Sequence, residues 1–178
     1  MAEEIVMAGF GGQGVMVMGQ LLSYAGMLEG KSVSWFPSYG PEMRGGTANC
    51  SVVVASEPIG SPVVTEPTCV VAMNRPSLDR FERAIRPGGV LVYNSSLIDR
   101  KPERKDVRVI AVPANEIAIE LGNDKVANMC ALGALIAATR VVKIESVVES
   151  LKKVLPERRH DLIPLNQEAL ARGALLAQ

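Results

Sequence analysis

The glycine-rich segment Gly9 to Gly14 is the first group of residues whose spacing suits chemistry, because it fits the pattern G-x-G-x-x-G. It follows an apolar stretch, Glu4 to Ala8, and precedes a helical pattern from Val15 to Leu28. Glycines between a strand and a helix let the backbone approach a phosphate, whose charge the N–H groups of the helix N-terminus favour. The alternative is a tight turn that only allows close helix packing. The candidate cofactor-binding residues are Gly9, Gly11, Gly12, Gln13 and Gly14.

A second loop, Ser38 to Gly46, places Arg44 beside two glycines just before a predicted strand. Arg44 offers a planar guanidinium to a phosphate or carboxylate, while the glycines let the main chain come close. We predict that this loop and the first glycine turn lie at the same end of an open sheet. The alternative is a surface turn in which Arg44 is solvated and paired with Glu42. The candidate binding residues of this loop are Tyr39, Arg44 and Gly45.

The nicotinamide version of the glycine motif also needs an acidic residue about twenty positions on, at the end of the second strand, to hold the ribose hydroxyls. Here that region reads Ser34 to Pro37, and the nearby Glu29 comes before the strand, at the end of the helix. A self-sufficient NAD-dependent dehydrogenase is therefore disfavoured.

Cysteine and histidine usage argues against a metal centre or an acid/base site in this chain. Cys50, Cys69 and Cys130 form no Cys-x-x-Cys pair of the kind that binds zinc or an iron–sulfur cluster, and we expect buried, reduced thiols. His160 is the only histidine and lies in a charged segment, where we expect it to be solvated. We therefore predict no metal ligand and no catalytic residue.

The elements that must position these loops alternate between strands and helices. This alternation predicts a single α/β domain over residues 1–178, with a mainly parallel, doubly wound sheet, helices on both faces and a helical C-terminal part. The charged segment Asp99 to Asp106 is expected to be a solvated loop. The predicted strands are Glu4–Ala8, Ser32–Phe36, Thr47–Ala55, Cys69–Met73, Val90–Tyr93 and Val107–Val112; the predicted helices are Val15–Leu28, Pro76–Arg86, Ala114–Leu121, Lys125–Thr139, Ile144–Leu155 and Pro164–Ala177.

Composition narrows the classes of partner. The 178 residues include 19 Lys and Arg against 19 Asp and Glu, so the overall charge does not favour binding to nucleic acid. The acidic start, Met1 to Glu4, is unlike a secretory signal. The small-apolar stretch Ala127 to Ala138 is too short for a membrane span, so we expect a buried helix there. These features favour a cytoplasmic protein with no membrane segment.

The two loops together resemble the gamma subunit of 2-oxoacid:ferredoxin oxidoreductases, of the pyruvate/ketoisovalerate oxidoreductase catalytic type. The resemblance runs from about Ile5 to Ile144. Tyr39 to Gly46 is most similar to the stand-alone gamma chain of 2-oxoglutarate enzymes, with branched-chain 2-oxoacid enzymes close behind. Further segments that agree are Glu57–Pro62, Gly88–Val90, Asn94–Ser96, Val112–Ala114, Ala127–Met129 and Leu132–Ala134.

The resemblance implies a complex that oxidatively decarboxylates a 2-oxoacid to an acyl-CoA and passes electrons to ferredoxin. It places thiamine diphosphate, Mg²⁺ and 4Fe-4S clusters on partner subunits, and none of them on this chain. Coenzyme A becomes the expected ligand of the Gly9 to Gly14 turn and Arg44. We therefore expect the isolated chain to be inactive. The rival interpretation is a free-standing nucleotide-binding or regulatory α/β protein.

A subunit of such a complex is expected to bury an apolar interface, and to self-associate through that uncovered surface when isolated. Trp35 and Phe36, which end a predicted strand just before the second loop, are either core residues or apolar anchors at an interface.

Overall fold

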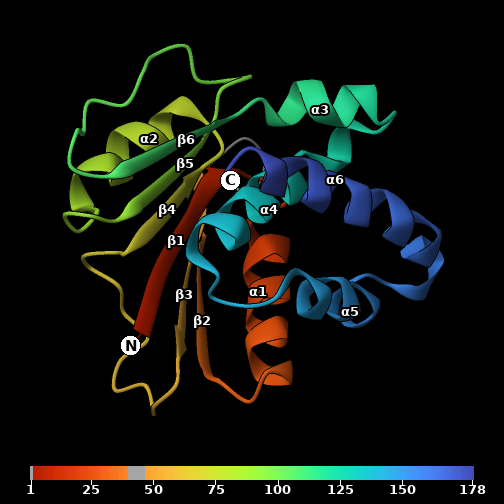
Figure 1. Ribbon diagram of the computed structural model, residues 1–178, viewed down its shortest axis with the longest axis horizontal. Coiled ribbons are helices and arrows are strands. Elements are labelled where there is room, and N and C mark those ends of the chain that lie inside the picture. The colour runs from red at the N-terminus through yellow and green to blue at the C-terminus, as the bar shows by residue number, and fades with distance from the viewer. Residues whose placement is uncertain (1, 40–46) are drawn as a thin grey trace.

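The computed structural model describes residues 2–39 and 47–178, and within them six strands form one sheet in the order β2-β3-β1-β4-β5-β6 (Figure 1). β3 runs antiparallel to both of its neighbours, whereas β1, β4, β5 and β6 pair in parallel. The strands are β1 (Ala2–Phe10), β2 (Ser32–Tyr39), β3 (Thr47–Ala55), β4 (Cys69–Ala72), β5 (Val90–Asn94) and β6 (Arg108–Val112).

The predicted α/β fold is confirmed, and the six predicted strands are all present, but the sheet is mixed. β3 lies between β1 and β2, and both of its pairings are antiparallel. The short connection from Tyr39 to Thr47 explains the antiparallel pairing of β3 with β2, because it is too short for the helical crossover that a parallel pair needs.

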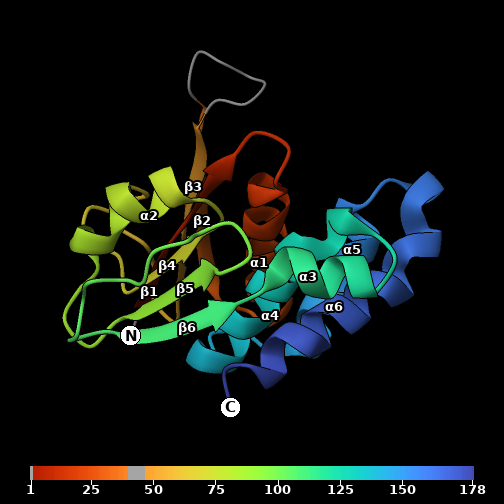
Figure 2. The same cartoon turned by 90° about the horizontal axis from the view of Figure 1, so that it is seen from above.

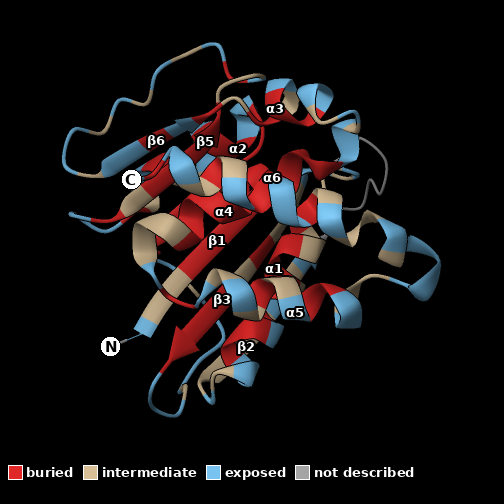
Figure 3. Ribbon diagram, turned by 45° about the vertical axis from the view of Figure 1, so that its right-hand side comes forward, coloured by how far each residue is buried: buried red, intermediate tan, exposed pale blue. Residues whose placement is uncertain are grey.

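Helices cover both faces of the sheet, though unequally. One face carries α1 (Val15–Leu28) and α4 (Ala127–Thr139), and the other carries the short α2 (Arg75–Phe81) (Figure 1). Outside α4 and α1 lie α3 (Ala114–Glu120), α5 (Ile144–Val154) and α6 (Ile163–Leu175). Figure 3 shows buried residues along the strands and exposed residues on the outer sides of α5 and α6.

Side chains alternate between the two faces of the sheet along each strand, and this alternation produces one hydrophobic cluster on each face. In β1, Ile5 and Met7 face the α1 and α4 side, while Val6 faces the α2 side, and all three are buried. α4 is apolar on all sides because it lies between the sheet and α6, and its residues 127–136 are all buried. This is the buried helix predicted from its composition. In the described part of the chain, no helix is long and apolar enough to cross a membrane.

The three cysteines are free and buried, as predicted. Burial raises the pKa of the Cys50 and Cys69 thiols to about 12 and that of Cys130 to about 11. Thiols with such values are almost entirely protonated at neutral pH, so they are poor nucleophiles and poor metal ligands. Their role in this fold is packing.

The segment from Asp99 to Asp106 is a loop with most residues exposed, as predicted, and Glu82 anchors it to the rest of the protein. The side chain of Glu82 is 4% exposed and accepts a hydrogen bond from Arg100 Nη2 at 2.7 Å. It also accepts the backbone N–H of Arg104 at 3.1 Å and that of Glu103. Burial acts to raise the pKa of Glu82, but these hydrogen bonds and the Arg100 charge outweigh it and hold the pKa below its ordinary value.

Glu82→Gln is expected to lower the free energy of unfolding by about 2 kcal/mol at pH 7, because it removes the charge from three hydrogen bonds. A carboxylate with a lowered folded-state pKa stabilises the protein above its ordinary pKa of about 4.3, and the contribution disappears as the pH falls through the folded value. The difference between wild type and variant should therefore shrink in acid. Urea unfolding at pH 7 and pH 3.5, with exposed Glu103→Gln as the control, measures this; a difference that persists at pH 3.5 contradicts it.

Candidate functional site

The candidate site lies at the end of the sheet formed by the carboxyl ends of β1, β4 and β5. The chain leaves β1 into α1 on one face and leaves β4 into α2 on the other, so the crossovers diverge between these two neighbouring strands (Figure 2). Ligands of open α/β sheets bind in the crevice at such a point, beyond the carboxyl ends of the strands. The Gly9 to Gly14 turn occupies this position.

The turn needs its glycines for two different reasons. Gly12 and Gly14 have φ values of 95° and 74°, in the left-handed region that glycine adopts without strain. A Cβ atom on Gly14 would also lie 2.3 Å from Asn128 Nδ2, and one on Gly9 would lie 2.7 Å from Gln13 Oε1. Gly14 caps α1, and no side chain of the described residues caps that helix. Its first-turn N–H groups are therefore available to an anion, at the positive end of the helix dipole.

The side chain of Gln13 makes three hydrogen bonds at this end of the sheet. Its Oε1 accepts hydrogen bonds from Phe10 N at 2.7 Å and from Asn74 Nδ2 at 3.2 Å, while its Nε2 donates to Met73 O at 3.3 Å. The side chain thus ties the end of β1 to the end of β4. Among the predicted site residues, Gln13 shapes the turn with its side chain, while the glycines present main chain.

Asparagines near the ends of β4 and β5 lie at the same end of the sheet as the glycine turn and were not singled out as site residues from the sequence. Asn74 accepts Ser77 N at 2.9 Å and so caps α2. Asn94 is fully buried, donates to Met73 O at 3.3 Å and to Asn115 Oδ1 at 2.7 Å, and accepts Ala114 N at 3.2 Å. The available signal was an asparagine at the end of β5 and another two residues after the end of β4.

Asn128, in the first turn of α4, holds the glycine turn from the other side. Its Nδ2 donates to Gly14 O at 3.2 Å, and the residue is 6% exposed. Its Oδ1 has no hydrogen-bond partner within residues 2–39 and 47–178. This bond fixes the left-handed residue from which α1 starts, so Asn128 positions the N–H groups that face an anion. The N-termini of α1 and α4 meet here.

The residues on either side of the second loop lie at the same end of the sheet as the glycine turn. Tyr39 pairs with Ala48, and Thr47 pairs with Phe10, which begins the glycine turn. The residues that flank the loop therefore lie beside that turn, as predicted. Arg44 and Gly45 themselves lie outside the described residues.

The sheet order gives a further reason against a dinucleotide fold. In that fold the second strand lies beside the first, and its terminal acid reaches the ribose bound at the glycine turn. Here antiparallel β3 occupies the position beside β1, and β2 is one strand further away. The disfavoured NAD-dehydrogenase interpretation is thus weakened again, because the strand that should carry the acid is displaced.

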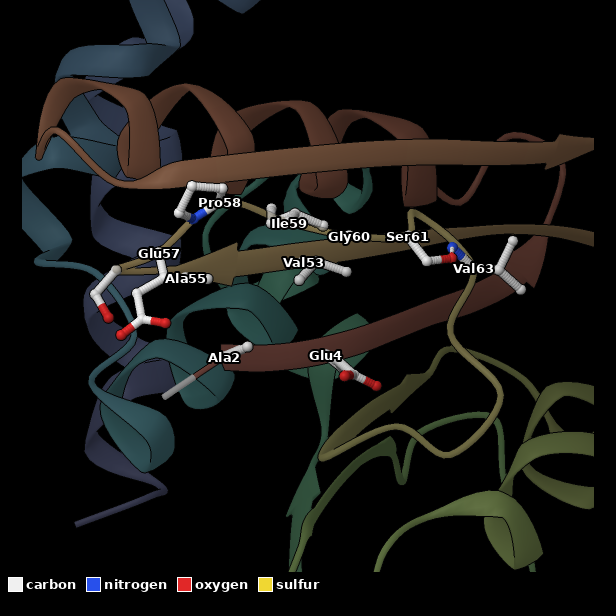
Figure 4. Close-up of a pocket in the computed structure, with 11 residues that line it drawn as sticks. Ala2, Glu4, Val53, Ala55, Glu57, Pro58, Ile59, Gly60, Ser61 and Val63 are labelled. Atoms are coloured by element: carbon white, nitrogen blue, oxygen red, sulfur yellow. Dashed lines mark hydrogen bonds between the residues drawn. The ribbon is translucent and has the colours of Figure 1, made fainter.

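A cavity of about 290 Å³ lies at the opposite end of β1, between β3 and the loop that follows it (Figure 4). Val53, Ile59 and Val63 contribute its apolar lining, and Glu4 and Glu57 its carboxylates. Glu4 is paired with Arg86 at 2.8 Å. Carboxylates repel phosphates, so this cavity is a poor candidate for a phosphorylated ligand. Within the described residues, no group of three or more His, Cys, Asp or Glu residues could hold a metal ion.

A family model and individual relatives all place the chain among the 2-oxoacid oxidoreductase subunits. The family model described as pyruvate ferredoxin/flavodoxin oxidoreductase matches residues 4–176. Ketoisovalerate oxidoreductase subunit VorA of Methanothermobacter marburgensis is 40% identical over 171 residues, which cover 96% of this chain and 36% of VorA. 2-oxoglutarate synthase subunit KorC of Methanocaldococcus jannaschii is 36% identical over 161 residues, which cover 88% of this chain and 86% of KorC. The chain thus spans about a third of VorA and nearly all of KorC.

Solved structures agree with the sequence matches. The gamma subunit of a keto/oxoacid ferredoxin oxidoreductase from Geobacter sulfurreducens superposes with a TM-score of 0.87 at 28% identity, covering 99% of this chain and 97% of that one. The 2-oxoglutarate:ferredoxin oxidoreductase from Magnetococcus marinus, solved with 2-oxoglutarate, coenzyme A and succinyl-CoA bound, gives a TM-score of 0.88 at 26% identity. That match covers 99% of this chain and 31% of the Magnetococcus chain.

Proposed function

Because this chain belongs to the pyruvate ferredoxin/flavodoxin oxidoreductase family, we propose that it is the gamma-type subunit of a complex that oxidatively decarboxylates a 2-oxoacid to an acyl-CoA. Ferredoxin is the proposed electron acceptor. Thiamine diphosphate, Mg²⁺ and the 4Fe-4S clusters belong to partner subunits in this proposal, and the complex is cytoplasmic. The match to KorC, which is itself described as a subunit and is covered over 86% of its length, supports the subunit role.

The observation that carries a ligand-binding role is the glycine turn at the switch point of the sheet. α1 starts at Val15, after the cap residue Gly14, and no side chain of the described residues caps it; Gly12 and Gly14 hold the main chain in a form that a Cβ would strain. Such a turn suits the phosphates of coenzyme A. The proposed contacts are the N–H groups of the Gly9 to Gly14 turn, together with Tyr39, Arg44 and Gly45 of the second loop. Coenzyme A supplies the thiol that accepts the acyl group.

We propose 2-oxoglutarate as the acid. The resemblance of Tyr39 to Gly46 to the gamma chains of 2-oxoglutarate enzymes supports it, as does the match over 86% of KorC, whereas the match to VorA has higher identity but covers 36% of VorA. Comparison of kcat/KM for 2-oxoglutarate, ketoisovalerate and pyruvate on the purified complex tests this choice. A preference for ketoisovalerate contradicts the substrate and leaves the subunit role intact.

The subunit role is tested by affinity capture of the tagged chain from native lysate. We expect a brown complex that reduces ferredoxin or viologen with 2-oxoacid and coenzyme A, whereas the chain alone shows no activity. The rival, a free-standing nucleotide-binding protein, rests on the glycine turn and has a different outcome. It predicts capture without a thiamine-dependent partner, together with calorimetric binding of NAD or ATP to the chain alone.

A further inference from the structure

The two edges of the sheet differ in how they are protected from pairing. β6 has five residues, and Arg108 at its start reaches the carbonyl of Ala177 near the C-terminus. β2 has eight residues and no charged side chain, and no other strand of the described residues pairs with its outer side. Natural edge strands are usually short, charged or interrupted by proline, because an open edge pairs with another strand. β2 has only Pro37, near its carboxyl end.

α1 lies directly above the boundary between β2 and β3. A Cβ on Gly19 would lie 2.7 Å from Trp35 Nε1 and 2.6 Å from Cys50 Sγ, one residue from each strand. A Cβ on Gly26 would lie 2.7 Å from Val33 and 3.4 Å from Val54, again one from each. The glycines therefore bring the helix close to both strands, and its axis follows their boundary.

Within residues 2–39 and 47–178, the side of α1 that faces the outer edge of β2 is only partly covered. Successive helical residues are about 100° apart, so Met16, Gln20 and Met27 lie roughly 60–100° around the helix from the two glycines that face the sheet. The opposite flank, with Met18 and Ala25, is completely buried. Met27 is 58% exposed, and Met16 and Gln20 are partly exposed. On the other face of the sheet, Phe36 of β2 is 49% exposed.

We propose that β2 pairs antiparallel with β2 of a second copy of this chain, across a two-fold axis perpendicular to the sheet. That symmetry keeps both α1 helices on the same face. Because strands are about 4.8 Å apart and each α1 lies over a β2–β3 boundary, the two helix axes come to lie about 10 Å apart. This is close to the separation of packed helices, roughly 8–10 Å. Strand pairing and packing of the Met16, Gln20 and Met27 surfaces thus occur together.

The separation of about 10 Å between the two α1 axes also favours a second copy as the partner. A strand of an unrelated protein can form hydrogen bonds with the free backbone groups of β2, but it brings no helix to the exposed side of α1. Self-pairing also places no charged residue opposite another, since Ser32 to Tyr39 is neutral. Pro37 lacks an N–H group, so the pairing centres on Ser34 and uses residues 32–36. Phe36 then packs beside Ser32 of the copy, on the face away from α1.

Sedimentation velocity of the full 178-residue chain over a wide concentration range tests the dimer, and its outcome is independent of activity or coenzyme A. We expect a dimer whose dissociation constant rises at least tenfold in Met27→Lys, because a charged side chain then replaces the apolar one that packs against the Met16 and Gln20 surface of the copy. Ile119→Lys, on α3 and 68% exposed, is the matched control and should leave the dimer unchanged. Circular dichroism melting verifies that both variants fold. A monomer at every concentration, or an undiminished Met27→Lys dimer, overturns the proposal.

Oxidative cross-linking tests the strand pairing separately from the helix contact. Ser34→Cys places a thiol at the axis, opposite the same thiol of the copy, and should form an intermolecular disulfide rapidly. Ser38→Cys lies on the same strand and face and is more exposed, but it is displaced from the axis by four residues. Random collision favours Ser38→Cys, and the proposed pairing favours Ser34→Cys. Equal or faster cross-linking of Ser38→Cys overturns the proposed edge-to-edge arrangement.

Discussion

Gly173→Ala is expected to lower the free energy of unfolding of the chain by about 4 kcal/mol or more. α6 crosses α4 so closely that a Cβ on Gly173 would lie 1.8 Å from the carbonyl oxygen of Cys130. The contact is with backbone, so no side chain can move aside and the helices must separate. The higher helix propensity of alanine offsets only about 1 kcal/mol of this loss of stability. For a chain of this size we expect the melting temperature to fall by about 10 °C or more.

Gly133→Ala should have a similar effect, because its Cβ would lie 2.0 Å from Leu170 O in the same helix pair. The double variant should cost less than the sum of the two, since one separation of α4 and α6 relieves both clashes. Gly60→Ala is the control: Gly60 is exposed, and a Cβ there meets no atom within 4 Å. Calorimetric melting of the four variants measures these differences. A Gly173→Ala protein as stable as Gly60→Ala contradicts the close helix contact.

Arg44→Ala is expected to raise the apparent constant for coenzyme A at least tenfold in the assembled complex. Loss of a charge-assisted hydrogen bond to a phosphate costs roughly 1.5–3 kcal/mol, and each 1.4 kcal/mol is a factor of about ten. The KM for the 2-oxoacid should stay nearly unchanged, because the acid is expected to bind beside thiamine diphosphate on a partner subunit. Steady-state kinetics that vary coenzyme A and 2-oxoacid separately measure both constants.

Arg158→Ala is the matched control, since Arg158 is an exposed arginine far along the chain from both loops. An unchanged coenzyme A constant with a raised 2-oxoacid constant would make Arg44 a ligand of the substrate carboxylate. No change in either constant would return Arg44 to a solvated turn residue. In both cases the proposed phosphate contact is wrong, while the subunit role remains testable by capture of the complex.

Local patterns in the sequence predicted much of this protein. Runs such as Val52 to Val54 indicate buried strands, and the spacing of apolar residues from Val15 to Leu28 indicates a helix whose start at Val15 agrees with the structure. Burial of Cys50 and its two counterparts followed from the absence of any ligand spacing. These features depend on neighbours within a few residues, which is why sequence alone was sufficient.

Contacts between distant segments were decided only by the tertiary structure. Insertion of β3 between β1 and β2 depends on which strand edges meet, and alternation along a strand does not encode that choice. Asn128 donates to Gly14 O across 114 positions, so its part in shaping the glycine turn is invisible in either segment alone. The close approach of α4 and α6 likewise depends on Gly133 and Gly173 meeting backbone of the other helix. A residue's type indicates what it can bind, and only the fold determines which groups come within reach.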